Sequence, residues 1–192
     1  YDRDTTEWFN KDLYDASLIF FGNCNVNKDC QILLDNNINI KPWIYWPRRP
    51  FVLEKFIENN RFKSYSERNI ESIFIGNIEN NVQDKYRNGD LNWENVLDVY
   101  HCTYGLIKKF KQEEYLTHLS NSRFGLCLRG YGVKCHREME LMALGTVPIV
   151  TPDVDIKSFL APPEENKHYI RCDKPEHLKQ LCLRRNQEMN KN

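Results

Sequence analysis

The amino-acid sequence predicts an α/β protein, a three-layer sandwich in which helices flank a parallel sheet. The first observation behind this prediction is that short apolar segments alternate with amphipathic ones along most of the chain. The second is the segment 122–151, where an apolar strand, a turn with two glycines, a helix and another apolar strand follow one another. Such a strand, helix, strand unit makes its two strands parallel neighbours through a right-handed crossover.

Apolar segments that are bounded by turn residues are predicted to be strands. The first and third of them contain a Gly-Asn pair near their ends, and prolines at positions 42, 47 and 50 keep the second one short. The predicted strands are 16–23, 44–46, 72–78, 123–128, 147–151 and 168–172.

Helices are predicted where apolar residues recur three or four positions apart. An Asn88-Gly89 turn precedes a helix that begins near Asn92, and Gly145 stops the helix that follows the two glycines. The predicted helices are 51–62, the segment from about Asn92, 111–122, 135–144 and 175–189, with a short one within 24–38.

The length of 192 residues suffices for one domain, or for two small lobes that share a cleft. The polar stretch at 60–71 is the best boundary, so we expect one lobe at 1–68 and a second at 69–192. No segment approaches the roughly 20 apolar residues that span a bilayer. Since the chain begins at Tyr1, we expect the natural N-terminus to lie upstream, which leaves a signal peptide or an anchor there open.

The charge balance and the cysteine content limit the classes of partner and the cellular compartment that we expect. The 27 basic and 27 acidic residues balance, which argues against a dedicated nucleic-acid binder. The 7 cysteines are odd in number and scattered, and only Cys24 and Cys30 are close enough for a local disulfide. No Asn-x-Ser/Thr acceptor occurs. These features favour a reducing compartment, although cytoplasmic and luminal locations both stay open.

Polar residues gather just after the strand at 123–128. Ligands in open α/β sheets bind where strand C-termini meet helix N-termini, so this edge is the candidate site. The polar residues there are Arg129, Lys134, His136, Arg137, Glu138 and Glu140.

Each of these residues also has a structural interpretation. Arg137 and Glu140 could form an i,i+3 ion pair on the surface, but the apolar neighbours of Glu140 favour a functional role. We expect Lys134 and Glu138 to be surface groups. His136 could be a catalytic base or a structural histidine. The aromatic residues Trp43, Tyr45 and Trp46 could belong to a core or stack on a sugar ring.

The sequence favours a site without metal. The histidines and cysteines do not have the spacing of a zinc site, and no Asp-x-Asp motif precedes the candidate edge. A dinucleotide-dependent dehydrogenase or epimerase is disfavoured, because no Gly-x-Gly-x-x-Gly follows the first strand.

The spacing Arg137-x-x-Glu140, followed by Gly145-x-Val147-Pro148, resembles the donor-binding half of GT-B glycosyltransferases, and most closely the exostosin-like family. The resemblance covers roughly residues 70–155. It also includes Ser122-Arg123-Phe124, Arg129-Gly130, and the strand 72–77 with the trailing Arg87.

The resemblance implies a Rossmann-like lobe of GT-B type, with residues 1–68 as the remainder of an acceptor-side lobe. It implies a metal-independent hexosyl- or pentosyltransferase, which needs no cofactor and moves a sugar from a nucleoside-diphosphate sugar to a glycan or other hydroxyl acceptor. In this interpretation Glu140 holds the ribose, and the arginines face the diphosphate. The donor-binding residues would be Arg87, Arg129, Gly130, Gly132, Arg137, Glu140 and Gly145.

The catalytic base stays unassigned, and Asp12, Asp15, Glu54 and His136 are only candidates. The alternative function is a non-catalytic nucleotide-sugar-binding module or subunit that derives from a transferase lobe.

Overall fold

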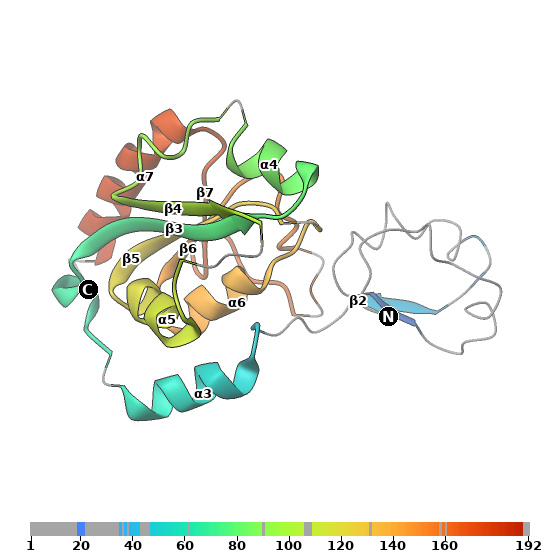
Figure 1. Cartoon of the computed structure of the whole chain (residues 1–192), viewed down its shortest axis with the longest axis horizontal. Coiled ribbons are helices and arrows are strands. Elements are labelled where there is room, and N and C mark those ends of the chain that lie inside the picture. Colours follow the sequence, from blue (N-terminus) through green and yellow to red (C-terminus); the bar gives the residue numbers. More distant parts are fainter. Residues whose placement is uncertain are drawn as a thin grey trace.

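The computed structural model describes a five-stranded sheet in which every neighbouring pair of strands is parallel (Figure 1). The described residues are 19–21, 35, 37, 39–42, 47–60, 62–89, 91–105, 109–130, 132–157, 159 and 161–189. The strands are β3 (Ile70–Ile78), β4 (Val99–Tyr104), β5 (Ser122–Cys127), β6 (Val147–Val150) and β7 (Ile170–Arg171). A separate parallel pair joins β1 (Ile19–Phe21) to β2 (Ile40–Pro42).

Helices cover both faces of the five-stranded sheet, which confirms the predicted three-layer α/β class (Figure 1). One face carries α3 (Pro50–Asn59), α5 (Gln112–Ser120) and α6 (His136–Ala143). The other face carries α4 (Asn81–Arg87) and α7 (Pro175–Met189). A short 3₁₀ turn, η3 (Tyr65–Glu67), precedes β3.

Successive residues of the central strands supply the two cores, as the period of two in a β-strand requires. Ile73 and Ile75 of β3 pack into the core that α3, α5 and α6 share. Phe74, between them, packs into the opposite core with Leu178 of α7. Because both faces of the sheet are covered, its central strands are apolar on both sides.

The strand order β4-β3-β5-β6-β7 creates a switch point in the topology. The chain leaves β3 towards one edge of the sheet, to β4, and leaves β5 towards the other edge, to β6. The loops after β3 and β5 therefore diverge and leave a crevice at the C-terminal edge of the sheet, where ligands of such folds bind.

Most of the predicted elements that the structure describes are confirmed, and the errors lie at β2, which was not predicted, and between residues 79 and 104. The helix predicted from about Asn92 is wrong: a turn at 94–96 leads into β4 instead. The sequence also did not predict α4, whose first turn is capped by the Asn80 side chain, which accepts from the Gln83 N–H at 3.0 Å. The strand predicted at 44–46 lies outside the described residues, and β2 ends just before it.

None of the described helices combines the length and the apolar composition that crossing a bilayer requires.

The five described cysteines are free thiols, whereas Cys24 and Cys30 lie outside the described residues. On α3, Leu53 and Phe56 pack into the core that it shares with α5. The division at residues 68 and 69 stays a prediction.

The Leu141 side chain of α6 packs directly against the backbone of β5, and a glycine permits this contact. A Cβ atom at Gly125 of β5 would lie 2.3 Å from Leu141 Cδ2 and 2.6 Å from Leu141 Cδ1. The close packing fixes the position of α6, whose first turn carries much of the candidate site described below.

We therefore expect Gly125→Ala to destabilise the protein by about 1–3 kcal/mol through overpacking. Leu141→Ala alone should cost about 2–5 kcal/mol by leaving a cavity. In the double variant the new methyl group occupies part of that cavity, so its cost should be less than the sum of the two. Urea denaturation of the three variants checks this, and strictly additive costs would contradict the described contact.

Candidate functional site

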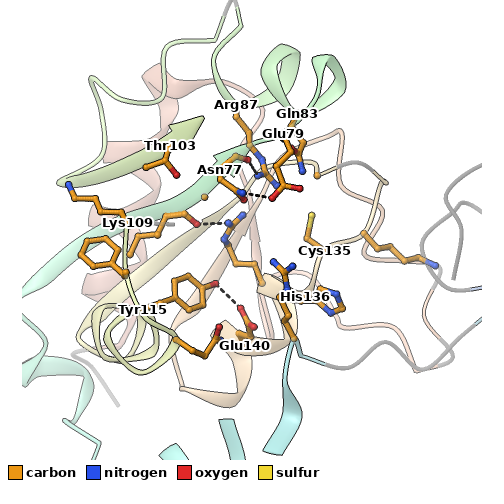
Figure 2. A pocket seen from close by; sticks show the side chains of 18 residues that line it. Asn77, Glu79, Gln83, Arg87, Thr103, Lys109, Tyr115, Cys135, His136 and Glu140 are labelled. Carbon is orange, nitrogen blue, oxygen red and sulfur yellow. Dashed lines mark hydrogen bonds between the residues drawn. The ribbon is translucent and has the colours of Figure 1, made fainter. Parts of the chain in front are cut away.

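A pocket of about 360 Å³ opens at the switch point between β3 and β5 (Figure 2). Its volume lies within the range of small-molecule sites in proteins. The lining residues come from the end of β3, from α4 and α5, from the loop after β5 and from the first turns of α6. The sequence prediction of a site at this edge of the sheet therefore coincides with a pocket there.

Two buried arginines form the centre of the pocket. Arg137, in the first turn of α6, is 9% exposed and donates from Nη2 to the Ile75 carbonyl oxygen of β3. Arg87, the last residue of α4, is 7% exposed and donates from Nη1 to the Asn77 carbonyl oxygen. The two guanidinium carbons lie 4.4 Å and 5.9 Å from the centroid of the same ring, that of Phe74. Both arginines therefore lie against the same aromatic ring.

Neither guanidinium forms an ion pair with a carboxylate in the described part of the chain. The ion pairs found among the described residues include neither Arg87 nor Arg137. Burial, and then the charge of Arg137, lower the pKa of Arg87 below its ordinary value. The like charges thus oppose each other, and this repulsion would be relieved by an anion bound between them.

Arg137 has two buried nitrogen atoms, Nε and Nη1, that find no hydrogen-bond acceptor among the described residues. A buried polar group without a partner costs about 1–3 kcal/mol, and a charged one costs more. An arginine fork matches the oxygen atoms of a phosphate or carboxylate and binds them in a bidentate manner. The unpaired N–H groups are therefore those that an anionic ligand would satisfy.

Glu140 lies one turn after Arg137 on α6 and is 3% exposed. Its Oε2 accepts a hydrogen bond from the Tyr115 hydroxyl of α5 at 2.7 Å. Burial raises the pKa of this carboxyl above its ordinary value, and the Tyr115 hydrogen bond opposes the rise in part. No ion pair joins Arg137 to Glu140, so the alternative of an i,i+3 surface pair is wrong.

Lys134 and Glu138 are buried, so the expectation that they are surface groups is wrong. Lys134 is 1% exposed, with Nζ 5.3 Å from the centroid of the Phe159 ring. Glu138 is 0% exposed, and its Oε2 accepts from the Cys135 N–H at 3.0 Å. A carboxylate at the third helical position reaches back in this way to cap its own helix. The position of Glu138, three residues after Cys135 and at the start of the helix, was the feature of the sequence that indicated a capping residue.

Gly130 is the one predicted donor-site glycine that lines the pocket. A Cβ atom there would lie 2.8 Å from Cys135 Sγ and 3.3 Å from Arg87 Nη2. Gly132 is buried but does not line the pocket. Gly145 lies just beyond the opposite end of α6, where its φ of 67° and the nearby Arg68 give it a structural role.

The Arg129 side chain also lies outside the pocket. Its guanidinium carbon is 5.0 Å from the centroid of the Tyr86 ring. The Arg129 carbonyl oxygen instead accepts from Arg87 Nε at 3.1 Å, so this residue helps to orient the other arginine. The pocket thus brings together Arg87, Gly130, Arg137 and Glu140 of the predicted set.

Among the candidate bases, His136 lines the pocket and Glu54 lies exposed on α3. Asp12 and Asp15 lie outside the described residues, as do Trp43, Tyr45 and Trp46. Within the described ranges, no cluster of three or more His, Cys, Asp or Glu residues is arranged to hold a metal ion.

Sequence reasoning missed several residues that line the pocket. Asn77 lies near the end of β3 and Glu79 follows the strand directly, and this place at the end of a predicted strand was a signal that they belong to the site. Tyr115 and Lys109 carried no such signal, because they approach from the segment between β4 and β5.

Comparison with protein-family models, with curated proteins and with solved structures finds no match for this chain. A functional assignment therefore rests on the geometry of the pocket and on the residues that form it.

Because two nitrogens of Arg137 find no acceptor among the described residues, we expect that replacing this residue changes the stability of the protein little. In the ligand-free protein, Arg137→Met removes a buried charge with two nitrogens that find no acceptor among the described residues, but it also removes the hydrogen bond to the Ile75 carbonyl oxygen. Because these effects oppose each other, stability should stay within about 1 kcal/mol of the wild type. The matched control is Arg68→Met. Arg68 is also buried, but it donates to the Ser122 and Leu144 carbonyls and to Thr146 Oγ1 at 2.9–3.0 Å.

Arg68→Met should cost at least about 2 kcal/mol, because it removes hydrogen bonds to a charged group and leaves buried acceptors unpaired. Chemical denaturation without ligand compares the two variants. Equal losses of stability would identify Arg137 as a structural residue.

We expect the ionisation of the buried Glu138 carboxyl group to make the stability of the protein depend on pH. Burial raises its pKa from 4.5 to about 7. A carboxyl group with a raised folded pKa stabilises the fold in its protonated form, so the contribution is largest below the unfolded pKa and is lost as pH rises through 7. Relative to Glu138→Gln, the wild type should lose about 3 kcal/mol between pH 4.5 and pH 8.

Glu67 is the control, because it caps η3 in the same way but is exposed to solvent. Hydrogen bonds from Ser64 lower its pKa, so its contribution is present at neutral pH and is lost as pH falls. The two Gln variants should therefore deviate from the wild type in opposite directions as pH changes. Denaturation midpoints across the pH range give the comparison, and parallel curves for wild type and Glu138→Gln would refute the raised pKa.

Proposed function

We propose that this chain contains the donor-binding lobe of a glycosyltransferase of GT-B type, similar to the exostosin-like family. The enzyme would move a sugar from a nucleoside-diphosphate sugar to a glycan or other hydroxyl acceptor, without a metal ion. The observation that carries the proposal is the pair of adjacent buried guanidinium groups that form no ion pair among the described residues, with the Glu140 carboxylate one turn away.

A nucleoside diphosphate matches these groups in their order along the pocket. Its two phosphates would lie against Arg137 and Arg87, where the oxygens would satisfy Nε and Nη1 of Arg137. The ribose would lie one turn along α6, where the Glu140 carboxylate can accept from its hydroxyl groups. The N-terminal end of the eight-residue helix α6 adds favourable partial charge at the phosphates.

The arginines would also assist the chemical step. As the bond between the sugar C1 atom and the diphosphate oxygen breaks, its electron pair moves onto the diphosphate, while the acceptor oxygen forms the new bond to C1 and gives its proton to a base. Fixed guanidinium groups stabilise the charge that develops on the leaving diphosphate, as a bound metal ion does in metal-dependent enzymes. His136 is the candidate base that lies at the pocket.

Titration calorimetry in EDTA tests the proposal with UDP, GDP, ADP, CDP and dTDP. We expect at least one nucleoside diphosphate to bind without a divalent cation. For the nucleotide that binds, Glu140→Gln should lower the affinity at least about tenfold, as expected when a hydrogen bond to a charged group is removed. The same substitution should leave the affinity for the 2′,3′-dideoxy analogue almost unchanged.

Failure of all five nucleotides to bind in EDTA would overturn the metal-independent donor site. Equal weakening of the ribo and dideoxy forms would remove Glu140 as the ribose ligand. Once a donor is identified, release of nucleoside diphosphate from it in the presence of a glycan acceptor separates the two functions. A transferase shows acceptor-dependent release, whereas a non-catalytic module binds the donor without consuming it.

A further inference from the structure

The charged groups of the pocket follow a regular order. Glu140 lies on α6 next to Arg137, which donates to the Ile75 carbonyl oxygen of β3. Two residues further along β3, the Asn77 carbonyl accepts from Arg87. Glu79 comes two residues after that, so the order along the pocket is carboxylate, guanidinium, guanidinium, carboxylate. Figure 2 shows Glu79 and Glu140 on opposite sides of the pocket.

Hydrogen bonds hold both the carboxylate and the backbone of Glu79. The Asn77 side-chain amide donates to Glu79 Oε1 and also to the Gly105 carbonyl at the end of β4, at 3.2 Å. The backbone N–H of Glu79 donates to Gln83 Oε1 of α4 at 2.6 Å. These contacts connect β3, the end of β4 and α4 around Glu79, whose exposed side chain at the mouth of the pocket accepts from Asn77.

Glu79 has no basic partner among the described residues, although Arg87 lines the same pocket. An acidic group beside an anion-binding centre repels a phosphate or a second carboxylate. It accepts hydrogen bonds from hydroxyl groups, and bonds to a charged acceptor are about twice as strong as neutral ones. This end of the pocket is therefore suited to an uncharged polyol.

We propose that Glu79, positioned by Asn77 and accompanied by Gln83, binds hydroxyl groups of the transferred sugar and selects an uncharged sugar over a uronic acid. The proposal rests on the proposed function, because it places the diphosphate at the two arginines and the ribose at Glu140. With those two parts fixed, the sugar on the far side of the diphosphate extends towards Glu79.

The experiment compares three ligands that share one nucleoside: the diphosphate that binds in the panel above, its glucose ester and its glucuronate ester. Their dissociation constants are measured by titration calorimetry in EDTA for the wild type, Glu79→Gln and Asp84→Asn. Asp84 is the matched control, because it is a carboxylate on α4 that accepts from Asn88 and does not line the pocket.

We expect Glu79→Gln to weaken the glucose ester at least about tenfold and to change the affinity for the diphosphate less than twofold. The wild type should bind the glucose ester more tightly than the glucuronate ester, and Glu79→Gln should reduce that preference. Asp84→Asn should leave all three affinities unchanged.

The two proposals fail in different ways. Absence of diphosphate binding to the wild type would overturn the proposed function itself. If the wild type binds the diphosphate but Glu79→Gln changes neither the affinity for the glucose ester nor the preference over glucuronate, the role of Glu79 is overturned and the donor site stands. An equal loss of affinity for the diphosphate and its glucose ester would also overturn it, because Glu79 would then act on the diphosphate.

Discussion

Two guanidinium groups packed on one phenylalanine ring, and bonded to backbone carbonyls, are the constraint on which the rest of this site depends. The guanidinium groups of Arg87 and Arg137 both lie against the Phe74 ring, and among the described residues neither forms an ion pair. Their approach needs space that only glycine leaves: a Cβ atom at Gly76 would lie 2.8 Å from the Phe74 ring and 3.3 Å from Arg137 Nη2. Gly130 has the corresponding role beside Arg87. The protein accepts a local electrostatic cost here, as functional sites commonly do.

The topology explains why the two arginines meet. Arg87 ends α4, on one face of the sheet, and Arg137 lies in the first turn of α6, on the other face. Only at the switch point, where the connections after β3 and β5 separate, can side chains from both faces reach the same crevice at the sheet edge. The close contact between Gly125 and Leu141 then fixes α6 on β5, and with it the distance of Arg137 and Glu140 from β3. The strand order and the contact between α6 and β5 thus determine the geometry of the site.

The sequence predicted the β5, α6 and β6 unit well, because its apolar strands, helical spacing and stop at Gly145 all indicate the same structure. It failed at β4, where His101 and Thr103 alternate with Tyr100 and Cys102 and mask the usual apolar pattern of a buried strand. It predicted that Arg137 and Glu140 belong to the site, but not that Lys134 and Glu138 are buried or that Arg129 turns away from the pocket. The direction of a side chain and the elements that pack over it decide whether it is buried or reaches the pocket, and neither can be predicted from local sequence spacing.

The most direct test of the central claim is a crystal structure of the protein with the nucleoside diphosphate that binds in EDTA. We expect the diphosphate to lie between the two guanidinium groups, with oxygen atoms at about 2.7–2.9 Å from Nε and Nη1 of Arg137, which find no acceptor among the described residues. We also expect the ribose hydroxyls at the Glu140 carboxylate. A nucleotide bound elsewhere, or one that leaves both Arg137 nitrogens without an acceptor, would contradict the central claim.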